Sequence, residues 1–398
     1  MEIQTLQTNY TGRRWRLFWL AFRASILTVL TLGFYRFWMK TRLRRFYWSA
    51  IKPGGIPLEY TGTGVEKLMG FLIAVVVMAF YIGIFNLILM FVSFSLLHDN
   101  VAAYAMSFVG LIPIYFYAQY RARRYVLART RWRGVRFGID PAAWSYAWRA
   151  MLHWLVTIVT LGFLYPRQVY WLEKFRTDRT WYGRERFSQE GGWKSLLRAA
   201  THLYIGIGLS LLSAILGWFN EIGFAILTVS LPWLLIGWLH FRVQSYRILA
   251  AGKRLGGGIQ FQANPRTGRV FGIYFLGNLI TTALLSVALM GMLFGGALLA
   301  LALDPASFND DNFEALFENR GPLAEYALFA AIGLVYFFFF ILWGVLSHVY
   351  VTLPLMRHYA ETITISNSHQ LAQIQQRPRD EFSEAEGFAE ALDIGAAI

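Results

Sequence analysis

The sequence contains no cysteine. This excludes disulfide bonds, thiolate metal sites, cysteine-held iron–sulfur clusters and cysteine nucleophiles. Charged residues are also scarce, at 15% of the chain against about a quarter in water-soluble domains, whereas 56% of the residues are hydrophobic. We therefore expect a polytopic membrane protein.

Acidic residues are the scarcer charged class, with 23 Asp and Glu against 37 Lys and Arg and a formal net charge of +14 over 398 residues. In membrane proteins an excess of basic residues collects in loops on the cytoplasmic side. The excess of basic residues is therefore better explained by membrane topology than by nucleic-acid binding. We expect no nucleic-acid partner.

Six apolar stretches are long enough to cross a bilayer, which takes about 20 residues. They form three pairs, and of the 37 basic residues only Arg320 lies in the links within pairs. The charge rule therefore predicts three helical hairpins that turn away from the cytoplasm, and a cytoplasmic C-terminus. The pairs are Leu68–Leu97 with Val101–Gln119, Leu196–Phe219 with Ile222–Phe241, and Val270–Leu303 with Leu323–Tyr350.

Two further apolar stretches, Trp15–Met39 and Trp144–Tyr165, have basic residues on both sides. If the second stretch crossed the membrane completely, the hairpin before or after it would have its basic ends outside the cytoplasm. This would contradict the preference of basic residues for the cytoplasmic side. We predict re-entrant or interfacial helices for both; the alternative is that Trp15–Met39 spans and leaves the N-terminus outside. The predicted fold class is an all-α polytopic membrane protein with six transmembrane helices in three hairpins, two re-entrant or interfacial helices and short cytoplasmic β-strands.

An internal repeat is visible in the tetrapeptides Thr31-Leu32-Gly33-Phe34 and Thr160-Leu161-Gly162-Phe163, each near the end of one of these two stretches. A helical hairpin follows each copy, which predicts a repeated module. We expect a first repeat unit over 1–140, a second over 141–269, a third helical hairpin over 270–365 and an acidic cytoplasmic tail over 366–398.

A finer repeat lies at the cytoplasmic helix ends, where a basic helix tail is followed by a glycine-bearing turn and a short alternating run. Such a run is what a strand needs once the chain leaves lipid. Five such strands would pair into a small sheet; the alternative is five unconnected loops. The runs are Leu58–Tyr60, Val135–Phe137, Arg184–Phe187, Ile259–Gln262 and Ile363–Ile365.

A family resemblance rests on Thr31-Leu32-Gly33-Phe34-Tyr35 with Trp38, on Arg42-x-x-Arg45 and its degenerate copies, and on the acidic tail from Asp380 to Ala389. Together these features resemble the YjgN-type family of bacterial inner-membrane proteins, described as a domain of unknown function. The resemblance covers most of the chain. It implies a multi-pass protein of the bacterial inner membrane and transfers no chemistry.

Chemistry inside a membrane needs ionisable side chains, which are costly enough there to stand out. Four histidines, His153, His202, His240 and His348, lie in or near the apolar stretches, but none has metal-ligand spacing. No Asp or Glu lies in the centre of a predicted span, and the glycines at 256–258 lack the phosphate-loop signature. We therefore expect no enzymatic activity, no metal and no cofactor.

Basic residues interleave with Tyr and Trp where the apolar stretches end. Arginine and aromatic side chains together can bind RNA, but beside membrane helices they are the usual anchors at headgroup depth, where they attract anionic lipid. We expect contacts with anionic membrane lipid, or with a membrane-protein partner or a second copy of the chain, at Arg42, Arg45, Arg121, Arg124, Arg131, Arg176 and Arg247.

The C-terminal tail is acidic and carries the aromatic residues Phe382 and Phe388. One reading is a solvated, disordered end. The other is a latch, in which Phe382 and Phe388 bury apolar area while the carboxylates meet the basic helix ends.

The leading functional hypothesis is a non-enzymatic membrane module that binds anionic lipid or a membrane partner at its basic cytoplasmic face. The rival is a transporter or channel for a small solute or lipid, supported by the repeated half-helices interrupted by glycine and threonine. A wet cavity lined by Arg23, Arg149 or His202 would favour transport, whereas a packed interior would favour the binding module.

Overall fold

The computed structural model describes residues 5–97, 110–303 and 322–377. The chain divides into two compact units. One comprises Met1–Gly12, Lys40–Phe271 and Arg357–Ile398, and the other comprises Arg13–Met39 and Gly272–Met356. The four regions predicted from the sequence were defined by repetition along the chain, whereas these two units are defined by compactness. The four regions therefore stay a prediction.

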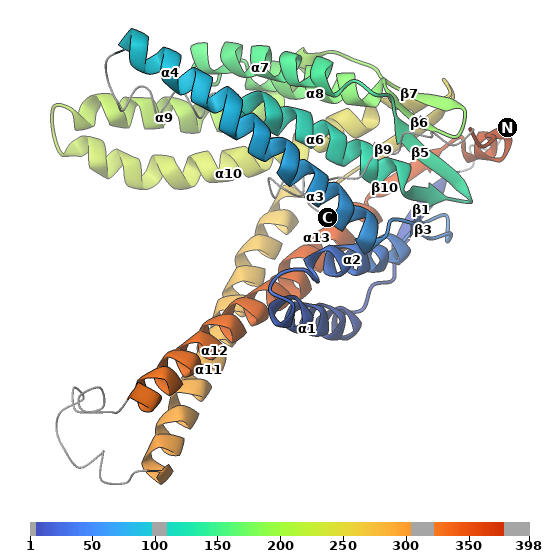
Figure 1. Ribbon diagram of the computed structural model, residues 1–398. Coiled ribbons are helices and arrows are strands. Elements are labelled where there is room, and N and C mark those ends of the chain that lie inside the picture. The colour runs from blue at the N-terminus through green and yellow to red at the C-terminus, as the bar shows by residue number, and fades with distance from the viewer. Residues whose placement is uncertain (1–4, 98–109, 304–321, 378–398) are drawn as a thin grey trace. The chain divides into compact units, whose positions relative to one another are not determined.

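Ten short strands of the first unit form one antiparallel sheet (Figure 1). Their order is β2-β1-β10-β9-β8-β7-β6-β5-β4-β3. Because the two end strands, β2 and β3, follow one another in the chain and contact each other, the sheet curves into a nearly closed barrel. The strands are β1 (Leu6–Tyr10), β2 (Ile51–Pro53), β3 (Leu58–Tyr60), β4 (Thr130–Trp132), β5 (Val135–Ile139), β6 (Thr180–Tyr182), β7 (Glu185–Gln189), β8 (Lys253–Leu255), β9 (Ile259–Ala263) and β10 (Ile363–Ser366).

This sheet shows that the predicted all-α fold class is wrong. Buried backbone N–H and C=O groups need partners, and hairpins that follow successive helices at the same end obtain them by pairing with one another. The five segments expected to be strands coincide with β3, β5, β7, β9 and β10. The prediction missed β1, β2, β4, β6 and β8, which are only three to five residues long and too short to show a period.

The conformation of the hairpin turns explains why several of them contain glycine. Between β4 and β5 only Arg133 and Gly134 remain, with φ of 52° and 79°. Two consecutive residues with positive φ are typical of the type I′ turn, whose twist matches that of the strands it joins. Glycine adopts this conformation without strain, and a glycine with positive φ also lies in the turns that follow β2, β6 and β8.

Five equivalent backbone hydrogen bonds fasten the sheet to the helices. In each, the residue directly after a strand donates its N–H to a carbonyl at the end of a helix or within two residues after it, where carbonyls lack partners within the helix. The chain therefore leaves the sheet toward each following helix at a fixed point. The donor and acceptor pairs are Thr11 and Ala50, Thr61 and Arg129, Asp140 and Arg179, Glu190 and Gly252, and Asn264 and Thr362, at 2.8–3.3 Å.

Apolar side chains fill the inside of the sheet. One buried cluster joins Trp132, Tyr182, Leu255, Ile259 and Ile365, which come from five different strands. Leu371, from the short 3₁₀ helix Ser368–Gln373, completes it. The described part of the barrel is thus a packed core and not a pore, in keeping with small barrels in which side chains fill the interior.

The helices of the first unit extend from the sheet (Figure 1). Buried Tyr120, Tyr146 and Phe175 hold α6, α7 and α8 together, and Tyr170, Leu196 and Phe241 hold α8, α9 and α10. The π-helical turn Tyr81–Phe85 joins α3 to α4, and 3₁₀ turns precede α9. The helices are α2 (Arg36–Ala50, from Lys40 onward), α3 (Gly64–Phe80), α4 (Asn86–Leu97), α6 (Leu111–Ala128), α7 (Ala143–Val159), α8 (Tyr165–Thr177), α9 (Thr201–Gly217) and α10 (Ile222–Ala251).

Four helical segments in the described part of the chain are long and apolar enough to cross a membrane: Trp193–Gly217, Ile222–Ala251, Thr267–Gly296 and Phe329–Glu361. They match the second and third predicted hairpins. The first predicted hairpin is not among them. Its first half is divided between α3 and α4. Only residues 110–119 of its second half are described, and they lie in or next to α6, which continues beyond Gln119 with Arg121, Arg123 and Arg124.

The second unit consists of α1 (Arg14–Leu30), most of α11 (Thr267–Leu303), α12 (Pro322–Ser347), the π-helical turn His348–Thr352 and the start of α13 (Leu353–Glu361). Within it α1 contacts α12. The buried residues of α1 are Leu17, Ala21 and Ala24, spaced three or four apart so that they share one face.

The two Thr-Leu-Gly-Phe segments form turns of the same conformation. Leu32 and Leu161 have φ of 52° and 49°, and Gly33 and Gly162 have φ of 93° and 86°. Each glycine N–H bonds the carbonyl five residues earlier, at 2.7 and 2.8 Å, as in a Schellman helix end. Each turn therefore ends one helix and precedes another. Trp15–Met39 is divided between α1 and α2, whereas Trp144–Tyr165 is the single helix α7 with the turn at its end.

Candidate functional site

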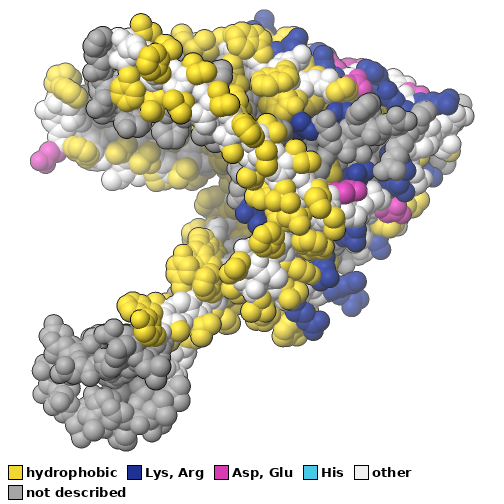
Figure 2. Space-filling model, viewed as in Figure 1, with side chains coloured by type: hydrophobic (Ala, Val, Ile, Leu, Met, Phe, Trp, Pro, Cys, Tyr) yellow, Lys and Arg dark blue, Asp and Glu magenta, His cyan; other side chains and the backbone are white. Residues whose placement is uncertain are grey.

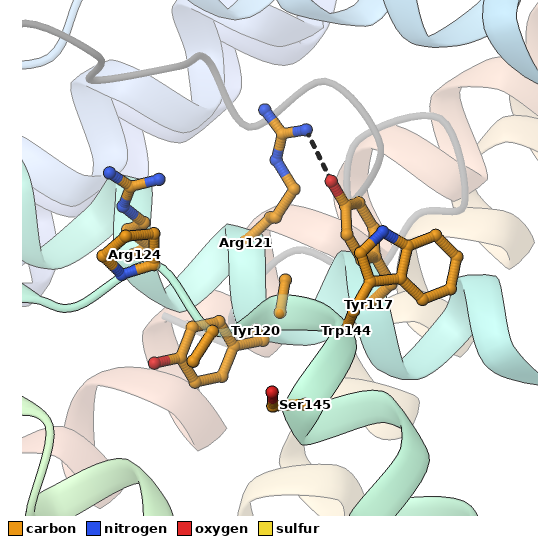
Figure 3. Close-up of a pocket in the computed structure, with 9 residues that line it drawn as sticks. Tyr117, Tyr120, Arg121, Arg124, Trp144 and Ser145 are labelled. Carbon is orange, nitrogen blue, oxygen red and sulfur yellow. Dashed lines mark hydrogen bonds between the residues drawn. The ribbon is translucent and has the colours of Figure 1, made fainter.

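A pocket of about 290 Å³ lies in the first unit where α6 ends and α7 begins (Figure 3). Two residues that the sequence nominated for lipid contact, Arg121 and Arg124, both line it. The described residues that line it are Tyr117, Tyr120, Arg121, Arg124, Pro141, Ala142, Ala143, Trp144 and Ser145.

The helix α6 supplies one wall. Its residues Ala118, Ala122 and Tyr125 are buried, whereas Arg121 and Arg124 are only half-buried. Residues three apart lie on the same helix face, which turns both guanidinium groups toward the pocket. Arg121 Nη1 donates to the Tyr117 hydroxyl at 3.0 Å one turn earlier, as the dashed line in Figure 3 marks.

The second wall is the loop from β5 and the first turn of α7. The loop is fixed because Asp140 donates its N–H to Arg179 and accepts at its carbonyl from the Tyr120 hydroxyl at 2.7 Å. Ala142, at the start of α7, makes no capping hydrogen bond through its side chain. The first-turn N–H groups and the positive end of the helix dipole therefore add to the charge of the two arginines.

Aromatic rings close the side of the pocket. The rings of Tyr117 and Trp144 lie 4.7 Å apart between centroids at an angle of 42°. Trp144 is 64% exposed, so the pocket has a large aromatic side chain at its mouth. Burial raises the pKa of Tyr120 to about 12, and its hydroxyl stays a neutral donor to Asp140.

Positive charge dominates this site. None of the nine lining residues is acidic. The adjacent Asp140 carboxylate is already engaged by Arg186 at 3.0 Å and by Arg377 at 3.9 Å. The pocket thus combines guanidinium donors, helix N–H groups and aromatic faces, which suits a phosphate or carboxylate group carried by an amphipathic molecule.

A second basic cluster surrounds Glu173 of α8, a residue that the sequence analysis did not single out. Its carboxylate meets Lys253 Nζ at 2.6 Å, Arg176 Nη2 at 2.8 Å and Arg123 Nη2 at 3.8 Å. Burial alone would raise the pKa of the Glu173 carboxyl, but the three cations outweigh it and hold the pKa well below its usual range. The spacing Glu173-x-x-Arg176 was the available signal, because residues three apart on a helix can pair.

The Glu173 cluster supports the pocket from behind. The Arg176 guanidinium lies 5.7 Å from the centroid of the Tyr146 ring, and that ring lies 5.3 Å from the ring of Tyr120. Arg123 belongs to α6, between the two pocket arginines. Glu173 therefore helps to position both walls without lining the pocket.

The other nominated residues are not brought together with this pocket. Arg42 is exposed on α2, and Arg45 Nη2 donates to the Gly62 carbonyl at 2.9 Å. Arg131 lies on β4, Arg176 belongs to the Glu173 cluster and Arg247 is exposed on α10. Phe382 and Phe388 lie outside the described residues. Lipid contact at these positions stays a prediction.

The histidines form no recognisable metal centre. His202 and His240 lie 5.1 Å apart between ring centroids, and His153 Nδ1 lies 3.3 Å from Arg167 Nη1. Within residues 5–97, 110–303 and 322–377, no group of three or more His, Asp or Glu side chains is arranged to hold a metal ion.

Comparison with known proteins gives a family and no activity. No curated protein and no solved structure matches the chain. One family model matches residues 5–284, which is more than half of the chain. The resemblance seen in the sequence is confirmed as membership of a bacterial family of unknown function, and the YjgN-type name stays a prediction. The chain belongs to the family of bacterial proteins of unknown function called DUF898.

Proposed function

We propose that this protein is an integral inner-membrane protein that binds the phosphate headgroup of an anionic lipid in the pocket between α6 and α7. The observation that carries the proposal is the convergence of Arg121, Arg124 and the first turn of α7 on one pocket, whose nine described lining residues include no acid. Arginine is suited to phosphate because its planar guanidinium donates two parallel hydrogen bonds.

The surroundings favour a lipid over a free anion. Trp144 and Trp148 are 64% and 60% exposed on α7, and apolar residues such as Leu155 and Ile158 continue the same helix. Tryptophan and tyrosine are enriched at the depth of lipid headgroups because their rings are apolar with one polar edge. In Figure 2 hydrophobic side chains cover the helices of the first unit, and basic side chains gather toward its sheet.

The distribution of basic residues also suggests how the protein is oriented in the membrane. The hairpins of the sheet carry Arg133, Arg184 and Arg186, and basic residues favour the cytoplasmic side. We therefore place the sheet, the pocket and the C-terminus in the cytoplasm. Cysteine labelling from outside the cell should leave Arg184→Cys unlabelled; labelling of this variant would overturn the orientation.

A duplicated module is part of the proposal. Its support is the shared backbone conformation of the turns at Leu32-Gly33 and Leu161-Gly162, each joining two helices before a hairpin. Transport is the less favoured function, because the inside of the described sheet is packed with apolar side chains.

The test uses a matched pair of double substitutions. Arg121→Gln with Arg124→Gln removes two charges from the pocket. Arg42→Gln with Arg45→Gln removes two charges at the same spacing on α2, outside the pocket. Since each arginine near an anionic surface contributes about 1 kcal/mol, the pocket variant should lose about 2 kcal/mol, or roughly 30-fold, in affinity for phosphatidylglycerol.

The readout is anionic lipid retained through purification, quantified by mass spectrometry, together with titration by short-chain phosphatidylglycerol. A loss confined to the pocket variant supports a defined site. Equal losses in both variants would show a diffuse basic belt, and no loss in either would overturn the proposed function.

A further inference from the structure

The chain leaves the first unit within α11 and returns to it within α13. Both passages adjoin neighbouring strands of the sheet, because Ala263 ends β9 and its register partner Ile363 begins β10. The Asn264 N–H donates to the Thr362 carbonyl at 3.3 Å, which continues this pairing by one step. The start of α11 and the end of α13 are therefore held close together within the first unit.

A histidine joins these two helix ends. His358 of α13 is 8% exposed, and its Nε2 accepts the N–H of Arg266 at 3.0 Å. Val270 donates its N–H to the Arg266 carbonyl at 3.1 Å and closes the first turn of α11. In a capping box the side chain three residues later accepts the N–H of such a first residue. Here that residue is Arg269, which has no acceptor, and His358 supplies the acceptor from another helix.

This hydrogen bond requires a neutral imidazole. A backbone N–H only donates, so the His358 Nε2 must offer a lone pair, and the proton of the neutral ring is on Nδ1. A protonated ring carries a proton on both nitrogens and accepts from neither. An unperturbed histidine has a pKa of about 6.5. The bond therefore exists in one protonation state of the ring and is lost in the other.

Charges of both signs act on this imidazole. Arg266 and Arg269, at the start of α11, oppose its protonation, and Glu361, three residues later on α13, favours it. The neighbouring titratable side chain is Tyr359, whose ring centroid lies 6.1 Å from that of the imidazole. Glu361 meets Arg357 at 4.0 Å, and its side chain is 49% exposed. Since residues three apart on a helix can pair, Glu361 offers a second partner to a charged ring.

We propose that His358 is an acid-operated switch at the junction where α11 and α13 meet the sheet. The neutral ring holds the start of α11, and the protonated ring releases the Arg266 N–H and pairs with Glu361. The first turn of α11 then loosens while the strands stay paired, because the bond from Asn264 to Thr362 joins backbone groups that do not titrate. None of these residues is among the described residues that line the pocket between α6 and α7, so the switch is separate from the proposed lipid site.

Amide hydrogen exchange in the purified full-length protein tests the switch. After correction for the intrinsic effect of pH on exchange, protection of residues 266–270 should fall by about tenfold between pH 8 and pH 5, because each pH unit below the titration of the ring changes the balance by up to about tenfold. Protection of the Asn264 N–H should stay constant over the same range. Equal protection of residues 266–270 at both pH values would overturn the proposal.

Two substitutions separate titration from packing. His358→Gln keeps an acceptor on a polar side chain that does not titrate, so protection of residues 266–270 should no longer depend on pH. The matched control is His369→Gln, which removes an exposed histidine of the 3₁₀ helix Ser368–Gln373 and should keep the pH dependence of the native protein. Loss of the dependence in both variants, or in neither, would contradict the assignment to His358.

A third substitution, Glu361→Gln, tests the second partner. Without the carboxylate the charged ring has lost its counterion, and release of the Arg266 N–H should require a lower pH. At pH 5 the protection of residues 266–270 should be about threefold higher than in the native protein, as expected for an exposed ion pair. Identical protection of the two proteins at pH 5 would show that the ring does not exchange partners.

Discussion

Arg121 and Arg124 line a pocket, whereas Arg123, on the same helix, meets a buried carboxylate. Both regions combine arginine with tyrosine, and they differ in one respect. Glu173 supplies an internal anion to three cations, but none of the described residues that line the pocket is an acid. The comparison teaches that the position of a single carboxylate distinguishes a basic cluster that includes its own anion from one whose described lining residues include none.

The largest expected effect is on the Glu173 cluster. Glu173→Gln leaves Arg123, Arg176 and Lys253 close together without their anion. Breaking a buried ion pair costs 3–5 kcal/mol, and we expect about 3 kcal/mol because the Glu173 side chain is 13% exposed. Thermal unfolding in detergent measures the loss.

The matched control is Glu190→Gln. This residue pairs with Arg254 at 3.2 Å but its side chain is 60% exposed, and exposed pairs contribute under about 1 kcal/mol. Equal unfolding temperatures for the two variants would remove the distinction between the buried cluster and ordinary surface pairs.

Acid should weaken the same cluster. A carboxyl whose pKa is lowered by folding contributes stability that is fully present above its unfolded pKa, about 4.3, and that is lost as the pH falls toward the folded value. The unfolding temperature of the native protein should therefore approach that of Glu173→Gln only below about pH 4. A gap between the two proteins that closes between pH 5 and 8 would contradict the assignment.

Neutralising two neighbouring arginines one at a time should have an intermediate effect, and each variant should change a different property. Arg123→Gln should lower stability by about 1 kcal/mol, because Glu173 keeps Arg176 and Lys253, and should leave lipid affinity unchanged. Arg121→Gln should lower affinity for phosphatidylglycerol by about fivefold with little change in unfolding temperature. If either variant changed both properties equally, the two clusters would be one functional unit.

The sequence identified the apolar helices because length and hydropathy alone mark Ile222–Ala251 or Thr267–Gly296. The sheet was underestimated because a three-residue strand such as Thr130–Trp132 looks like the end of its preceding helix and gains its hydrogen bonds from chain far away in sequence. Pairing of that kind is decided by tertiary context and not by local pattern.

The sequence predicted only part of the pocket, because the rest of it also depends on tertiary contacts. Arg121 and Arg124 could be nominated because they follow the apolar part of a helix. Trp144, which lines the same pocket, lies beyond a hairpin, and nothing in the local sequence places it against Tyr117. In the sequence, Glu173 is a single acidic residue among basic ones, and it was not predicted to be important. Only the fold brings Lys253 and Arg123 to it.

The smallest expected effect concerns the orientation of one pocket arginine. Tyr117→Phe removes the hydroxyl that accepts from Arg121 at 3.0 Å but keeps the aromatic ring, whose centroid lies 5.6 Å from the guanidinium. A typical hydrogen bond contributes about 1 kcal/mol, and part of this is recovered when Arg121 binds phosphate, so affinity for phosphatidylglycerol should change by about threefold or less. The control is Tyr115→Phe, two residues earlier on α6 and outside the pocket lining. Isothermal titration should separate the two variants, and a tenfold loss in Tyr117→Phe would show that the Tyr117 hydroxyl itself contacts the lipid.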